Sequence, residues 1–289
     1  MISALHGFIA AMSSARRPLT RGILFLIFSL GGLVARGATE TAEPYGHNPA
    51  AGHTAQVNGI ALYYEVYGTG TPLVLLHGNG GSLADLHFQI AAFRPDHQVI
   101  AIDSRGHGRS EMGPGRLTYE QIADDAAALL AALHAGPADV FGWSDGGIVA
   151  LLLALRHPSA VHRIALSGAN LSPGALAPGD LTGMAQDLRD ARAQLAAGDQ
   201  SRPWATVCQQ IDLMLTQPHI TDAELARITA PALVLAGEHD LIPEPHTRAI
   251  AAGLPRATLR IFAGAGHAAL QEKPEEFNAA LRTFFAPAP

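Results

Sequence analysis

The chain reads Gly142-Trp143-Ser144-Asp145-Gly146-Gly147 between an apolar run that ends at Phe141 and a helix-like stretch over 148–156. A strand passes directly into a helix only through a tight bend, which holds its central residue in a strained backbone conformation. Glycines on either side leave room for the neighbouring backbone, so the bend exposes the serine hydroxyl. The segment predicts a nucleophilic Ser144 on a sharp turn; a serine that merely caps a helix is the alternative.

Further segments extend this pattern along the chain. An apolar run over 71–76 leads into His77-Gly78-Asn79-Gly80-Gly81, a loop of mostly small residues whose backbone N–H groups can donate hydrogen bonds. A second apolar run, 99–102, ends in Asp103-Ser104-Arg105-Gly106-His107-Gly108-Arg109-Ser110. Late in the chain, apolar runs over 231–236 and 257–262 precede Asp240 and the glycine-rich loop of His267, respectively.

Together these segments resemble the α/β-hydrolase fold family, and the resemblance covers roughly residues 54–285. It implies an α/β fold with a mostly parallel sheet, helices on both faces and a small helical cap. In that family the catalytic residues follow one another as serine, acid and histidine. The resemblance therefore assigns Ser144 as nucleophile, Asp240 as acid and His267 as base. The family's oxyanion donors correspond here to the backbone N–H groups of Asn79 and Asp145.

These residue types have defined chemical tasks. A serine hydroxyl is a poor nucleophile until a neighbouring imidazole accepts its proton. A carboxylate on the other ring nitrogen fixes the tautomer and stabilises the imidazolium, and preset N–H donors stabilise the developing oxyanion. For Asp240 the alternative is that it or Glu238 caps the helix that begins near Pro245.

The chain has 14 histidines, and position decides among them. His107 lies in a turn that is structural in the family, and we expect His77 to brace the oxyanion loop. His239 adjoins the acid but follows the wrong strand to act as the base. A metal site is the rival explanation for so many histidines, but the sequence has no His-x-His pair and no His-Glu-x-x-His helix. We therefore expect neither a metal nor a cofactor.

Asp145 has two interpretations. A carboxylate in the first turn of a helix is favourable without any function, because it complements the helix dipole. A carboxylate beside the nucleophile can also select substrates that carry a positive charge near the ester, such as amino-acid esters. The sequence leaves both open.

Helix-like segments over 119–134, 148–156, 246–254 and 275–285 alternate with apolar strands, which indicates one α/β-hydrolase domain over 54–289. An Asn-Gly pair within 55–62 predicts a hairpin at the antiparallel edge. Residues at about 170–228 interrupt the alternation and predict a cap with amphipathic helices over 181–197 and 203–216. We expect the apolar face of this cap to cover the substrate pocket, and a short, mostly apolar cap suits a small or medium substrate. The predicted substrate contacts are Trp143, Met184, Leu188, Trp204, Ile211 and Met214.

The N-terminal region carries a separate signal. Arg16-Arg17 and Arg21 precede an apolar run over 22–35, which is shorter than the roughly 20 residues that span a bilayer. Ala35-Arg36-Gly37 then offers the small residues that signal peptidases recognise. We expect residues 1–37 to be an export signal, 38–53 a flexible linker, and the mature protein periplasmic or secreted. An uncleaved membrane anchor is the alternative.

Charge and cysteine content limit the partners. The chain has 19 Lys and Arg against 25 Asp and Glu, a net charge of −6, which argues against a nucleic-acid partner. The single cysteine, Cys208, permits no internal disulfide. We expect a small-molecule substrate and no stable membrane association after signal cleavage, while the oligomeric state stays open.

The sequence thus predicts a serine hydrolase that cleaves a carboxylic ester or related acyl bond through an acyl-enzyme on Ser144. A serine at the turn argues against dehalogenase or epoxide hydrolase chemistry, which in this superfamily uses an aspartate nucleophile. A lactonase or a carbon-carbon bond hydrolase on the same scaffold is the main alternative. A cofactor-free haloperoxidase and a non-catalytic ligand-binding protein are less favoured.

Overall fold

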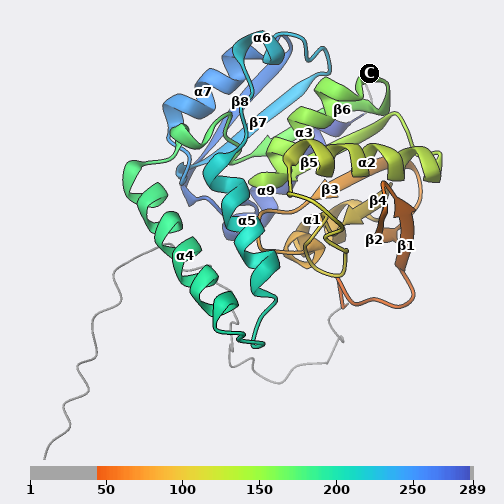
Figure 1. The fold of residues 1–289 in the computed structure, drawn as a ribbon. Helices are drawn as coiled ribbons and strands as arrows, with labels where there is room; N and C mark the ends of the chain where they lie inside the picture. Colours follow the sequence, from red (N-terminus) through yellow and green to blue (C-terminus); the bar gives the residue numbers. More distant parts are fainter. Residues whose placement is uncertain (1–43, 287–289) are drawn as a thin grey trace, which may run out of the picture.

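The computed structural model describes residues 44–286, and the predicted export signal lies outside this range. An eight-stranded sheet in the order β1-β2-β4-β3-β5-β6-β7-β8 runs through the molecule (Figure 1). Pairing is antiparallel for β1–β2 and β2–β4 and parallel for the remaining neighbours. The strands are β1 (Gly52–Val57), β2 (Ile60–Tyr67), β3 (Thr71–Leu76), β4 (His97–Ile102), β5 (Ala138–Trp143), β6 (Val161–Ser167), β7 (Ala232–His239) and β8 (Ala257–Gly266).

Burial explains why the sequences of the central strands are continuous apolar runs. Residues 73–76 of β3 are all fully buried, since a parallel strand inside such a sheet is covered on both faces. The edge strand β1 instead leaves several side chains in solvent. Asn58 and Gly59, with φ of 44° and 78°, form the turn to β2, which confirms the predicted hairpin.

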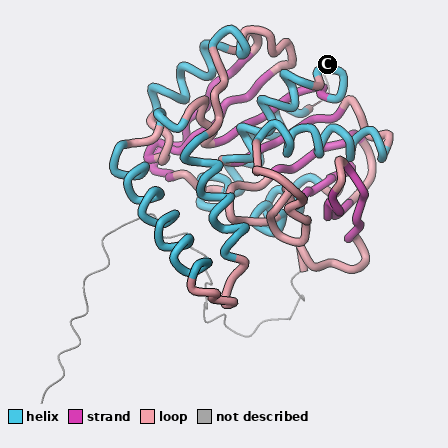
Figure 2. Tube along the Cα trace, in the orientation of Figure 1, coloured by secondary structure: helices cyan, strands magenta, loops and turns pink. Residues whose placement is uncertain are grey.

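Helices cover both faces of the sheet (Figure 2), and this layered architecture confirms the predicted fold class. One face packs against α2 (Tyr119–Leu133), α3 (Asp145–Arg156) and α7 (Glu244–Gly253). The other face packs against α1 (His87–Phe93), α8 (Ala269–Glu272) and α9 (Pro274–Phe285). Over residues 44–286, none of the helices combines the length and apolar character that crossing a bilayer requires.

A helical cap separates β6 from β7. It contains α4 (Pro178–Ala196), α5 (Trp204–Thr216) and the short α6 (Asp222–Leu225), and α4 and α5 lie side by side at one end of the sheet (Figure 1). Polar contacts dock α5 on the main domain: Gln210 Nε2 donates to the Gly106 carbonyl at 2.9 Å, and Gln209 accepts from the Leu117 N–H at 2.8 Å. The cap is therefore held at the edge where the parallel strands end.

The structure differs from the predicted linker over residues 44–53. The backbone N–H groups of Gly46 and Asn48 donate to the Glu65 carboxylate at 2.8 and 2.9 Å, and β1 already begins at Gly52. The hydroxyls of Tyr63 and Tyr67 also donate hydrogen bonds to the Glu65 carboxylate, each at 2.7 Å. Because Glu65 is fully buried, its charge requires such donors. The predicted linker therefore applies at most to residues 38–43, which lie outside the described residues.

Candidate active site

Ser144 sits on the bend between β5 and α3 with φ 56° and ψ −119°, a strained conformation for a residue with a side chain. A Cβ atom at Gly142 would overlap the Gly146 carbonyl, and one at Gly146 would overlap the Leu76 carbonyl. The Ser144 N–H donates to the Ser167 carbonyl of β6 at 2.7 Å, which fixes the bend on the sheet. The strained bend predicted from the sequence is thereby confirmed.

His267 bridges Ser144 and Asp240. Its Nε2 lies 3.0 Å from Ser144 Oγ, and its Nδ1 lies 2.7 Å from Asp240 Oδ1. Because a buried carboxylate can only accept hydrogen bonds, the proton of the His267 ring lies on Nδ1. Nε2 therefore presents its lone pair to the serine hydroxyl. Gly168, with φ 65°, faces the imidazole, and a Cβ there would crowd the ring. The three side chains thus form one continuous line of contacts from Ser144 through His267 to Asp240.

The capping alternative for Asp240 does not match the structure. Asp240 follows β7, and its Oδ1 also accepts from the Ile242 N–H at 2.9 Å. Helix α7 begins only at Glu244 and has no side-chain cap. Glu238, the other candidate, accepts from the Gly264 N–H at 2.7 Å, away from His267.

His77 and His107 brace loops. His77 Nδ1 donates to the Gly78 carbonyl at 2.7 Å, and its Nε2 accepts from the Ser104 N–H at 3.0 Å. His107 Nδ1 donates to the Arg105 carbonyl at 3.0 Å. Burial, with His77 close by, lowers the pKa of His107 to about 3, so this ring is neutral at ordinary pH.

The two predicted oxyanion donors belong to segments that meet at Ser144. A Cβ at Gly78 would lie 3.2 Å from the Ser144 Cβ, so the loop after β3 passes directly beside Ser144. Asp145 is the first residue of α3, whose N-terminus favours developing negative charge. The side chains of the two donor residues are also joined, since Asn79 Nδ2 donates to Asp145 Oδ2 at 2.7 Å.

The Asp145 carboxylate already has protein partners. Besides Asn79, the Tyr119 hydroxyl hydrogen-bonds to it. Burial raises the pKa of Asp145, and the hydrogen bonds from Asn79 and Tyr119 oppose that rise. Its position in the first turn of α3 is the one expected from the sequence. The role of Asp145 in selecting cationic substrates stays a prediction.

A cavity of about 140 Å³ opens above Ser144 and His267. Four of the six predicted substrate contacts line it: Trp143, Met184, Ile211 and Met214. Trp143 is anchored by its Nε1, which donates to the His267 carbonyl at 2.9 Å. Leu188 and Trp204 do not line it, although they belong to the same apolar cluster of the cap as Met184.

Sequence reasoning missed Asp187 and Leu241, which also line this cavity. Asp187 follows Met184 by three residues on α4, so helical spacing places both on one face and was an available signal. Leu241 lies beside Asp240 in a loop, where no periodic pattern marks it. Within the described part of the chain, no cluster of three or more His, Cys, Asp or Glu side chains is arranged to hold a metal ion.

The comparisons with known proteins agree with this fold. The model of the Alpha/beta hydrolase family matches residues 73–280. The human serine hydrolase BPHL is 28% identical over 91% of this chain and 97% of its own length. The uncharacterized hydrolase YraK of Bacillus subtilis is 39% identical, but that match spans only 38% of this chain and 41% of YraK. The enol-lactonase of Burkholderia xenovorans LB400 superposes with a TM-score of 0.67 and 26% identity, over 81% of this chain and all of that one.

The crowding around Gly146 generates a stability prediction. We expect Gly146→Ala to lower the free energy of unfolding by about 2 kcal/mol or more, because the new methyl group meets the Leu76 carbonyl. Gly179 in α4 is the matched control, since a Cβ there meets nothing within 4 Å. Denaturant unfolding of both variants measures the difference, and equal stability of Gly146→Ala and the wild type would contradict the close packing described for the bend.

Proposed function

Because the chain belongs to the alpha/beta hydrolase family, we propose that it is a serine hydrolase that cleaves a carboxylic ester or related acyl bond through an acyl-enzyme on Ser144. The observation that carries this proposal is the continuous chain from Ser144 Oγ to His267 at 3.0 Å and from His267 to Asp240 at 2.7 Å. The strained bend supports it, since it presents the hydroxyl at the cavity floor.

In the proposed mechanism, Ser144 Oγ attacks the substrate carbonyl carbon while its proton passes to His267 Nε2. Asp240 stabilises the imidazolium, and the backbone N–H groups of Asn79 and Asp145 donate to the oxyanion. Collapse of the tetrahedral intermediate breaks the bond to the alcohol, which leaves with the proton from His267. Water, deprotonated by the same imidazole, then releases the acid and restores Ser144.

The cavity supports a substrate of limited size. Its volume of about 140 Å³ lies mainly between apolar side chains of the cap, among them Met184, Ile211 and Met214. Apolar walls suit a short acyl or alcohol group, and the few polar groups on the floor set its orientation.

A lactone is the second candidate substrate. It is a cyclic ester, so the same nucleophile, base and donors apply, and the acid and alcohol stay in one product. The likeness to the enol-lactonase of Burkholderia xenovorans LB400 over 81% of this chain favours it.

Labelling tests the nucleophile. We expect a fluorophosphonate probe to form one adduct, on Ser144, because His267 activates that hydroxyl alone. We expect Ser144→Ala to lose the adduct and nearly all ester turnover while it keeps its fold. Ser201→Ala, at an exposed serine of the cap, is the control, and we expect it to keep both the adduct on Ser144 and the ester turnover. Intact mass, peptide mapping and hydrolysis of p-nitrophenyl esters are the measurements, and normal turnover by folded Ser144→Ala would overturn the proposal.

A second pair of variants tests the acid. We expect Asp240→Asn to lower kcat by about 10³- to 10⁴-fold with little change in KM, because the amide no longer holds the required tautomer of His267. Glu238→Gln is the matched control, since its carboxylate contacts Gly264 instead, and it keeps kcat within about twofold of the wild type. Steady-state kinetics measure both, and the reverse pattern would assign Glu238 as the acid.

Asp187 generates a prediction about substrate charge. It lines the cavity, and no lysine or arginine of residues 44–286 lines it with Asp187. Burial raises the pKa of the Asp187 carboxyl, with Asp190 adding to the rise. We expect kcat/KM to favour a cationic over an anionic ester of equal size, and Asp187→Asn to reduce that preference by about fivefold, the equivalent of about 1 kcal/mol.

Asp190→Asn is the control for Asp187→Asn. Asp190 is exposed on the same helix and accepts from Gln186 at 2.8 Å, so we expect the charge preference to persist in this variant. The same preference in wild type and Asp187→Asn would remove Asp187 from substrate selection.

A further inference from the structure

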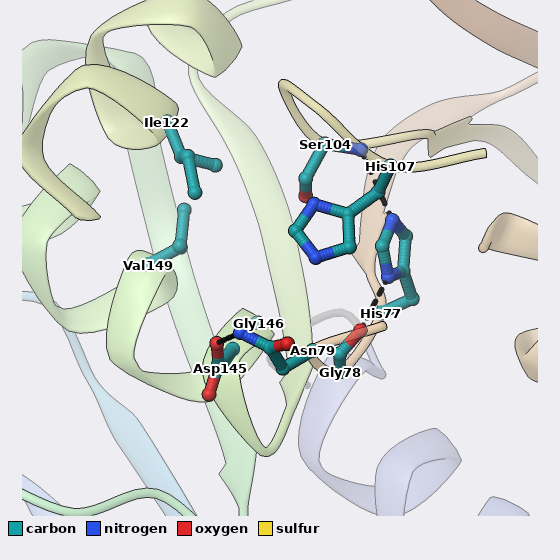
Figure 3. A pocket seen from close by; sticks show the side chains of 9 residues that line it. All are labelled: His77, Gly78, Asn79, Ser104, His107, Ile122, Asp145, Gly146 and Val149. Carbon is teal, nitrogen blue, oxygen red and sulfur yellow. Dashed lines mark hydrogen bonds between the residues drawn. The ribbon is translucent and has the colours of Figure 1, made fainter. Parts of the chain in front are cut away.

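A second, much smaller cavity lies behind the loop that follows β3 (Figure 3). Its volume is about 10 Å³, close to the space that a single water molecule requires. Gly78 and Asn79 line both this cavity and the larger one above Ser144. His107 and Val149 are among the other residues that line it.

Two buried polar atoms of this lining have no partner among the described residues: His107 Nε2 and Asn79 Oδ1. In Figure 3 the His107 ring and the Asn79 side chain lie on either side of the space. His107 is only 5% exposed. Buried polar atoms are rarely left unpaired, because burial removes their hydrogen bonds to solvent.

Both atoms are acceptors. The Arg105 carbonyl can only accept, so His107 Nδ1 carries the ring proton and Nε2 has a bare lone pair. Asn79 Nδ2 donates to Asp145 Oδ2 at 2.7 Å and to the Gln210 carbonyl at 3.2 Å, which fixes the amide with its oxygen on the other side. Neither side chain can therefore satisfy the other, and the site requires a small group with two hydrogens to donate.

We propose that this cavity is a binding site for one structural water molecule, which donates one hydrogen to His107 Nε2 and the other to Asn79 Oδ1. Water has the size and the two donors that the site demands.

The site has a consequence for catalysis, and this part rests on the proposed function. Asn79 contacts α3 through Asp145 and the cap through Gln210. The water adds a third tether, to the turn that contains His107. With the Asn79 side chain held from three directions, its backbone N–H has a fixed direction toward the oxyanion. Asn79 and His107 are therefore positioning residues, and their side chains do not touch the reacting atoms.

A high-resolution crystal structure of the wild-type protein tests the site directly. We expect one density peak within about 2.7–3.2 Å of both His107 Nε2 and Asn79 Oδ1. No peak, direct contact of the two side chains, or the shorter and more numerous contacts of a metal cation would each overturn the proposal. This measurement is independent of any enzymatic activity.

Displacement of the water tests its effect on catalysis. Val149 lines the cavity, so the extra methylene of Val149→Ile occupies the space of the water. We expect the density peak of the water to be absent from the structure of this variant. We also expect kcat to fall by about three- to tenfold with KM nearly unchanged, because the Asn79 backbone N–H still donates to the oxyanion but is held less firmly. Val66→Ile, the same change in β2 and remote from the cavity, keeps kcat.

Asn79→Ala completes the test. It removes the contacts to Asp145, Gln210 and the water together, while its backbone N–H remains. We expect kcat to fall by about tenfold or more, again with little change in KM. Unchanged kcat in Asn79→Ala, or in a Val149→Ile variant whose structure lacks the peak, would overturn the positioning role. Wild-type protein with neither turnover nor an adduct on Ser144 would instead reject the proposed function and leave the water site to the crystallographic result.

Discussion

The structure depends on one strained residue, Ser144, whose positive φ turns a central strand directly into a helix. Strain of this kind persists only where the surroundings leave no alternative. Here β5 is fixed between β3 and β6, and the backbone at Gly142 and Gly146 packs too closely to admit a side chain. The sheet thus stabilises the bend, and the bend brings the serine hydroxyl and the first turn of α3 to the same point.

The remaining groups reach that point because parallel strands end at one edge of a sheet. The loops after β3, β7 and β8 supply Asn79, Asp240 and His267, and the loop after β6 supplies the glycine against which the imidazole lies. Residues separated by more than a hundred positions therefore meet through topology alone. The cap closes over this edge and provides most of the apolar wall.

The sequence predicts those features of the fold that depend on interactions between residues close together in the chain. Glycine spacing at the bend, apolar runs in buried strands and the Asn-Gly hairpin each have a steric cause that acts over a few residues, and all reappear in the structure. Features that depend on distant partners were not predictable: the Glu65 carboxylate that fixes residues 46–48, and which members of the cap cluster line the cavity, as Met184 does and Leu188 does not. A helical stripe indicates which side chains are buried, but only tertiary contacts decide which of them face the substrate.

Asn79 illustrates why a loop next to the proposed nucleophile needs more than glycine. Small residues let the backbone approach Ser144, yet the same lack of side chains leaves the loop free to move. The amide of Asn79 compensates, since its nitrogen holds both the start of α3 and the cap, and its oxygen faces the turn that contains His107. Donors to an oxyanion stabilise it most when their direction is set before the reaction begins. In the proposed mechanism, the side chain of this residue therefore matters through the direction that it gives to its own backbone.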